Sequence, residues 1–401
     1  MTFKPASLTR QARSRPEAGS VRQIVQFGLV PQDGRRIQSG TVIASLVPVD
    51  YAMDTSRTHL IYAAGLAALV TLVMGSAPSG QSQAPLPARL ESYLKAHVKL
   101  TPEEQKRLRA GEPVTQLLES DPATEVAIFG AVWVASPISR YVEAVKNIEE
   151  FEKGDNFLVT KRISSPPRLG DFDRLSLPPD DVADLRTCTV GDCELKLGEA
   201  ALMRIKKETD WSKPTATADV ERSMRRLALD YVTAYLQGGN SRLAIYRDGE
   251  RPTFVAQEFA AMVDRMPSLT TYLPQLKKYL LEYPKVTLPK SESFLYWQEA
   301  KFGLKPTIRI NHLTIADQQT HVAVVSKMLY ASHYFWTAIE LRIMVPDPTR
   351  GEGFWFANVN RSRSDGLGGF VGSVIRGKVR SEAEEGMQAA LKITKSRMEN
   401  R

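Results

Sequence analysis

The sequence predicts an α+β domain that combines an antiparallel sheet with a long C-terminal helix. Three observations support this fold class. An apolar strand, Val126 to Ala135, runs directly into an amphipathic helix that extends to about Ile148. After Gly303, alternating strands follow one another through short connections, which favour antiparallel neighbours. The chain then ends in one long helix that reaches about Met398.

Residues 1–84 do not have the pattern of a folded domain. Residues 1–52 lack periodicity, and we interpret them as a mis-called extension ahead of the true start, Met53. Residues 53–84 have the pattern of a secretory signal peptide, in which the uncharged run Leu60 to Met74 is followed by small residues. The alternative is a single-pass inner-membrane anchor, although a span needs about 20 apolar residues. The sequence therefore predicts a periplasmic or secreted protein.

The remaining chain divides into a short helical segment and one larger domain. In the helical segment, residues 85–121, Thr101-Pro-Glu-Glu104 has the sequence of a capping box. The domain occupies residues 122–401, and Ser136-Pro137 predicts the start of its first helix. Amphipathic helices between about 200 and 300 are interpreted as an insertion into this domain.

The composition argues against a nucleic-acid partner. The chain has 401 residues, 43% hydrophobic and 24% charged, as is ordinary for a globular protein. Its net charge is +8, but residues 1–84 hold eight basic and four acidic residues, which leaves 45 against 41. No basic stripe interleaved with aromatic residues occurs, so nucleic-acid binding is not predicted.

The two cysteines, Cys188 and Cys193, are separated by four residues that include Gly191. This spacing matches neither a Cys-x-x-Cys motif nor a c-type haem attachment site. It suits a small disulfide loop in an oxidising compartment. Two free thiols, or a metal site completed by two distant ligands, are the alternatives. We predict the disulfide, no metal and no cofactor.

No motif assigns a catalytic residue. His312, His321 and His333 lie in or beside neighbouring predicted strands, so two of them can approach each other. However, neither a metalloprotease spacing nor a Gly-x-Ser-x-Gly motif is present. Basic residues near the start of the last helix are candidates for contact with lipid head groups, or they form a solvated face. They are Arg361, Arg363, Arg376, Lys378 and Arg380.

Two resemblances accompany these patterns. Val126–Ile163 and Phe354–Met398 are similar to the first and last parts of START-type and polyketide-cyclase-like helix-grip domains. Three further segments resemble segments of uncharacterised exported bacterial proteins: Cys188–Leu197, Phe294–Lys305 and Ser332–Phe335. The helix-grip resemblance implies a curved sheet around the last helix, and the helical insertion departs from it. It carries over no functional residue.

The helix-grip resemblance implies a hydrophobic pocket between the sheet and the last helix. We therefore expect an exported protein that binds or carries a lipid or other hydrophobic molecule at the envelope membrane surface. The alternatives are a hydrolase or cyclase that uses His312 or His333, and a module for protein–protein interaction. Residues expected to line the pocket, or else to form a filled core, alternate along the strands: Ile308, Ile310, His312, Phe335, Ile339, Leu341, Phe354 and Phe356.

Overall fold

The computed structural model describes residues 85–302, 305–367 and 369–400. The predicted extension (1–52) and the predicted signal peptide (53–84) lie outside the described residues. Within the described ranges, no helix is both long and apolar enough to cross a membrane.

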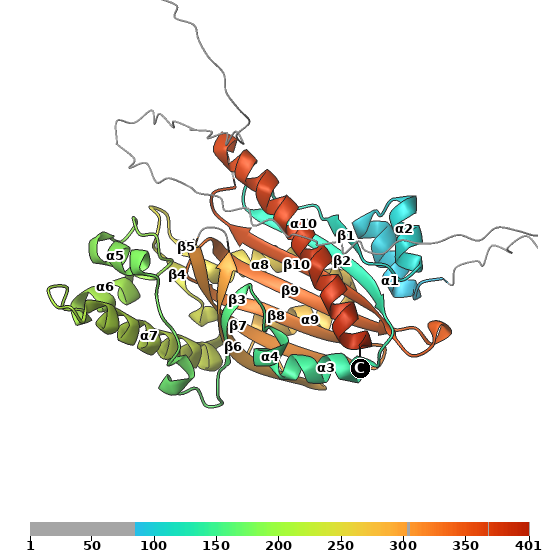
Figure 1. Cartoon of the computed structure of the whole chain (residues 1–401), viewed down its shortest axis with the longest axis horizontal. Coiled ribbons are helices and arrows are strands. Elements are labelled where there is room, and N and C mark those ends of the chain that lie inside the picture. Colours follow the sequence, from blue (N-terminus) through green and yellow to red (C-terminus); the bar gives the residue numbers. More distant parts are fainter. Residues whose placement is uncertain (1–84, 303–304, 368, 401) are drawn as a thin grey trace, which may run out of the picture. The chain divides into compact units, whose positions relative to one another are not determined.

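The fold is organised around an antiparallel sheet, which has eight strands within the described residues (Figure 1). The C-terminal helix α10 (Gly369–Glu399) follows the last strand. The predicted α+β class, with a large antiparallel sheet and a long C-terminal helix, is thus confirmed. From edge to edge the strands are β1 (Val114–Leu117), β2 (Glu125–Val134), β10 (Phe354–Ser364), β9 (Phe335–Pro346), β8 (His321–Ala331), β7 (Lys305–Gln318), β6 (Ser291–Phe302) and β3 (Phe157–Arg162).

One face of the sheet packs against α10, α3 (Ile138–Lys146) and α4 (Ile148–Phe151) (Figure 1). Gly130 of β2 lets α10 approach closely, because a Cβ atom there would lie 2.7 Å from Met387 Cγ. The rings of Tyr141 and Phe356 lie 5.2 Å apart and fill the space beside this contact. The side chains between the sheet and α10 therefore pack together as an apolar core.

The opposite face of the sheet is covered by the N-terminal helices and by the insertion between β3 and β6. Its buried residues form two apolar clusters, one with Ile339 and Leu341 and the other with Ile308 and Ile310. The sheet is therefore covered on both faces. The covering elements are α1 (Ala88–Tyr93), η1 (Leu94–Val98), α2 (Pro102–Arg109), η2 (Leu169–Phe172), α5 (Pro179–Thr187), α6 (Glu199–Glu208), α7 (Ala216–Gly238), η3 (Gly239–Arg242), β4 (Ile245–Tyr246), β5 (Thr253–Phe254), α8 (Val255–Asp264), η4 (Ser268–Tyr272) and α9 (Pro274–Glu282).

Two strands differ from the sequence prediction. β1 pairs with β2, although the whole segment 85–121 was predicted to be helical. β6 lies where the helical insertion was expected to continue, and the last insertion helix ends at Glu282. β6 shows no alternation of polar and apolar residues because both of its faces are covered. Tyr296 and Trp297, which point to opposite faces, are both buried.

Of the two predicted helix starts, one is confirmed and the other is displaced by one residue. The capping box is confirmed, because Glu104 N donates to Thr101 Oγ1 (3.3 Å) and Thr101 N donates to Glu104 Oε2 (2.7 Å). The start of α3 was predicted one residue too early. Pro137 is the N-cap residue, and the hydroxyl of Ser136 is buried without a hydrogen-bond partner within the described residues.

Candidate ligand cavity

A cavity of about 330 Å³ lies between α6, α7 and strands β7 and β8 of the sheet. We call it the β7 cavity. Its volume falls in the range of small-molecule sites, which are mostly apolar with a few polar groups. It is lined by Leu175, Leu197, Gly198, Ala200, Ala201, Met224, Leu227, Ala228, Asp230, Tyr231, Arg242, Ala244, Ile245, Ile308, Ile310 and Tyr330.

Two of the residues expected to line a pocket, Ile308 and Ile310, do line this cavity. They are two positions apart on β7, so both point to the same face of the sheet. That face is opposite α10, because Ile310 belongs to the cluster formed with Tyr235 of α7. The cavity therefore lies under the insertion and not between the sheet and the C-terminal helix.

Tyr330 supplies an unpaired polar group to the wall of the β7 cavity. Its side chain is buried, and its hydroxyl has no hydrogen-bond partner in the described part of the chain. Neighbouring Tyr231 differs, because its hydroxyl donates to Leu329 O (2.6 Å) and accepts from Ala244 N (3.3 Å). Burial raises the pKa of Tyr330, so the phenol stays protonated. A buried hydroxyl without a partner is unfavourable unless a ligand satisfies it.

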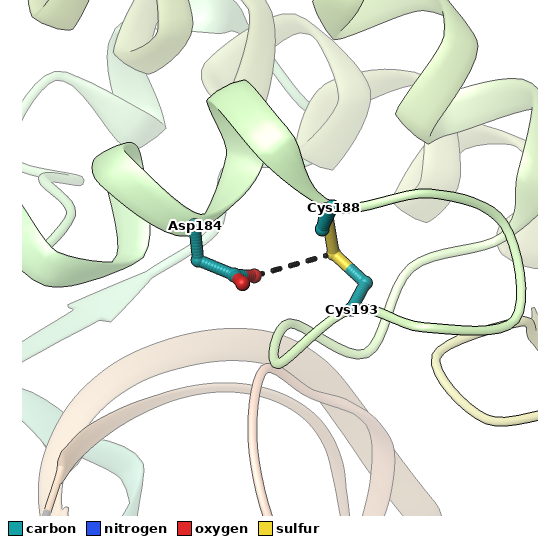
Figure 2. Close-up of side chains that lie close together, drawn as sticks. All are labelled: Asp184, Cys188 and Cys193. Carbon is teal, nitrogen blue, oxygen red and sulfur yellow. Dashed lines mark hydrogen bonds between the residues drawn. A yellow bond between two sulfur atoms is a disulfide. The ribbon is translucent and has the colours of Figure 1, made fainter. Parts of the chain in front are cut away.

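The cysteines form a disulfide beside the cavity wall. Cys188 and Cys193 are bonded, and an Asp184 carboxylate oxygen lies 3.4 Å from the Cys193 sulfur (Figure 2). Burial is the main cause of the raised pKa of Asp184, and the charges of neighbouring residues contribute less. These three residues are the metal-ligand cluster found among the described residues. The sulfurs are bonded to each other and therefore do not offer the thiolates that a metal requires.

The disulfide loop is connected to the cavity wall through the backbone. Gly191 N donates to Arg247 O (2.7 Å), and Arg247 N donates to Leu197 O (2.8 Å). Leu197 in turn lines the β7 cavity. The loop thus holds the segment that forms one side of the cavity.

We expect the double variant Cys188→Ser/Cys193→Ser to lose about 2 kcal/mol of unfolding free energy, because a short disulfide loop restricts the unfolded chain by this amount. Urea unfolding with and without a reductant measures the loss. The reductant is expected to lower the stability of the wild type and to leave the double variant unchanged. Equal midpoints for both proteins under oxidising conditions would contradict the prediction.

His312 is buried among aromatic residues of the insertion and not beside a carboxylate. Its Nδ1 shares a 2.9 Å hydrogen bond with the Tyr235 hydroxyl. Burial, and then the charge of Lys327, lower the pKa of His312 to about 3. A histidine with this pKa is neutral at physiological pH but is a weak base, because a general base works best when its pKa lies near the operating pH. His312 lines a different cavity of about 330 Å³ with Tyr283.

Lys327 of β8 is a buried cation that sequence reasoning missed. It is 1% exposed and donates to Asn240 Oδ1, and its ammonium lies 4.3 Å from the centre of the Phe259 ring. Burial alone lowers the pKa of Lys327 to about 7. The sequence did carry a signal, since Lys327 is the one Lys, Arg, Asp or Glu in the predicted strand His321 to Tyr330.

The three histidines of the sheet have separate partners. His333 Nε2 lies 2.9 Å from Asp181 Oδ2, and both residues are buried. Lys305 donates to the other oxygen of Asp181 at 3.2 Å, so this carboxylate joins α5 to the sheet. Nδ1 of His321 instead interacts with Thr320 Oγ1 at 3.1 Å. The described residues bring no two of these histidines into one metal cluster.

The other expected pocket residues do not share one cavity. Phe354 and Phe356 pack in the core of the α10 face. Ile339 and Leu341 were expected to face the last helix, but they point to the opposite face, in the cluster with Phe259. Successive residues of a strand point to opposite faces of the sheet. Leu341 is paired with Val359 of β10, which is an odd number of positions from Phe356, so Leu341 and Phe356 point to opposite faces. Phe335 is half-buried at the start of β9.

The basic residues near α10 do not form one solvated patch. Arg361 is buried and paired with Glu125, and the Arg363 side chain lies 3.2 Å from Glu258. Arg376 donates to Pro122 O at 2.6 Å. In contrast, Lys378 remains exposed. The structure therefore uses most of this charge for internal contacts.

Comparison with known proteins adds no family to this description. The sequence matches no known family model and no curated protein.

Proposed function

We propose that the chain is a START-like helix-grip protein that binds a hydrophobic ligand. The strand order β2-β10-β9-β8-β7-β6-β3 supports the helix-grip assignment. So do the two helices between β2 and β3 and the long helix after β10. In this proposal, the insertion between β3 and β6 has added helices to the second face of the sheet, and the ligand lies beneath them.

The β7 cavity is the observation that carries the proposed function. Its walls are mostly aliphatic and aromatic, with Asp230 and Arg242 as the charged lining residues, and Tyr330 adds one hydroxyl without a partner within the described residues. An uncharged hydrophobic molecule with one hydroxyl or carbonyl group fits this combination, because it covers the apolar wall and satisfies the phenol. Long-chain alcohols and sterols belong to this class.

The disulfide supports a role in the cell envelope. Disulfides persist in the periplasm and outside the cell, whereas the cytosol keeps thiols reduced. An exported carrier that binds lipid at the envelope membrane is therefore the setting that we propose. The signal peptide expected at residues 53–84 is part of this proposal and is tested by the mass of the mature protein.

We expect the substitution Ala201→Trp to abolish binding of dodecanol, because an indole on α6 fills the β7 cavity. Native mass spectrometry of the protein mixed with dodecanol measures the bound fraction. Met203→Trp is the matched control, since Met203 is on the same helix and 56% exposed. Tyr330→Phe is expected to weaken binding about fivefold, the effect of one neutral hydrogen bond. Undiminished binding by a folded Ala201→Trp protein would overturn the proposed function.

A further inference from the structure

A second apolar cavity lies beneath α1, and we call it the α1 cavity. Its volume is about 310 Å³, and its walls come from α1, η4 and strands β2, β8, β9 and β10. It shares Tyr272, Leu273 and His321 with an adjoining cavity of about 190 Å³. None of its lining residues belongs to the β7 cavity. The two spaces are therefore distinct candidate sites.

The floor of the α1 cavity is an apolar part of the sheet. Phe129, Ala357 and Val359 are buried there, and Leu90 of α1 covers them from above. Val345 of β9 also lines the cavity but is only partly buried. An apolar floor and cover of this kind suit an alkyl chain.

Two basic side chains lie at one part of the cavity wall. The Arg89 guanidinium on α1 is exposed and donates to Tyr272 O at 2.7 Å. Burial is the main cause of the lowered pKa of His321, and the nearby charge of Arg89 lowers it further. The charge of Asp317 acts in the opposite direction. The neighbourhood therefore combines a cation with an imidazole.

His321 offers an unused nitrogen to this neighbourhood. Nδ1 interacts with Thr320 Oγ1 at 3.1 Å, whereas Nε2 is buried without a partner among the described residues. When the Thr320 hydroxyl donates to Nδ1, the imidazole proton resides on Nε2, which then becomes a donor. Nε2–H together with the Arg89 guanidinium can receive a carboxylate or a phosphate.

The segment that closes the cavity is a π-helical turn. Ser268 and Tyr272 line the space, and they are the first and last residues of η4. η1 (Leu94–Val98), which follows α1, is a π-helical turn as well. The binding role is therefore argued from the lining residues and not from this turn.

We propose that the α1 cavity binds a single-chain amphiphile with an anionic head group. The alkyl chain lies over Phe129 and Val345, and the head group contacts Arg89 and His321. This site does not depend on the β7 cavity, whose expected ligand is uncharged. The protein would then hold two ligands of different charge on one face of its sheet.

Native mass spectrometry with dodecanoate and with dodecanol tests the proposal. We expect Val345→Trp to lose the dodecanoate adduct and to keep the dodecanol adduct, because the indole fills only the α1 cavity. Ala201→Trp is expected to give the reverse pattern. Dodecanoate that is lost in Ala201→Trp but kept in Val345→Trp would place the acid in the β7 cavity and overturn the inference. The proposed function has a separate readout, the dodecanol adduct.

A surface substitution tests the head-group contact without altering the core. Arg89→Gln is expected to weaken dodecanoate about tenfold in calorimetric titration and to leave dodecanol unchanged, because a charge-assisted bond is lost. Arg107→Gln is the matched control, since Arg107 also donates to a backbone carbonyl, Pro113 O at 3.0 Å. Equal dodecanoate affinity for both variants, or no dodecanoate binding by the wild type, would overturn the inference.

Discussion

Replacing Lys327 by Met is expected to stabilise the protein at pH 7 by about 2 kcal/mol. The wild type must bury an ammonium whose pKa falls to about 7, and each pKa unit corresponds to about 1.4 kcal/mol. Met keeps the length of the side chain and removes the charge. The net gain is smaller than the shift alone implies, because the bond to Asn240 and the contact with the Phe259 ring are also lost.

The same substitution is expected to change how stability depends on pH. The pKa of Lys327 is about 7 in the folded state and lies near 10.5 in the unfolded state, so between these values the unfolded chain binds more protons. Unfolding free energy of the wild type therefore rises with pH in this window, by roughly 2 kcal/mol from pH 7 to pH 9. This range lies above the ordinary pKa of His312, so that residue does not contribute to the rise.

Urea unfolding at several pH values between 7 and 9 measures both effects. In the Lys327→Met variant this site no longer titrates, so the unfolding free energy should change little between pH 7 and pH 9. Lys378→Met is the control, because Lys378 is exposed and should leave the slope of the wild type intact. A Lys327→Met protein that is less stable than the wild type throughout, with the slope retained, would contradict the explanation.

The second large effect is expected for Gly239→Ala, which should lower the unfolding free energy by at least about 4 kcal/mol. Gly239 follows the last residue of α7 and has φ +57° and ψ −136°, a conformation that residues with a side chain rarely adopt. A Cβ atom there would lie 1.7 Å from Tyr283 O, which is backbone and cannot rotate away. Strain and displaced backbone together exceed the effect of an ordinary substitution.

Gly238→Ala is the matched control for Gly239→Ala. Its φ is −117°, and its added Cβ would meet the flexible side chain of Arg242, which can move. We expect this variant to change stability by less than about 1 kcal/mol. Chemical denaturation of the two variants side by side measures the contrast. Similar stabilities would show that the turn after α7 adjusts more easily than its geometry implies.

The sequence predicted those parts of the fold that carry a regular apolar pattern or a short apolar run bounded by turn residues. β7, β9 and α10 were recognised from their regular apolar pattern, and β8 and β10 from their apolar runs. β6 was not recognised, since Tyr296 and Trp297 are buried on opposite faces and no alternation remains. β1 was missed for a different reason: its four residues are too few to show a period.

The candidate site was only partly predictable. Alternation shows which residues of a strand share a face, and it identified Ile308 and Ile310 as neighbours. It cannot show which face a helix covers, so Leu341 and Phe356 were assigned to one pocket although they point in opposite directions. The unpaired hydroxyl of Tyr330 has no sequence signal, because its environment comes from distant helices.

The pairing of β2 with β10 has a consequence for how the chain reaches this fold. β2 is buried at all ten positions, and its partner on the side of the main sheet is the last strand before α10. Contacts between residues so far apart in the chain form slowly. Until β10 has been synthesised, β2 presents an apolar strand with a free edge, which favours self-association. A nascent chain interrupted before residue 354 is therefore a substrate for chaperones and proteases rather than a partly working protein.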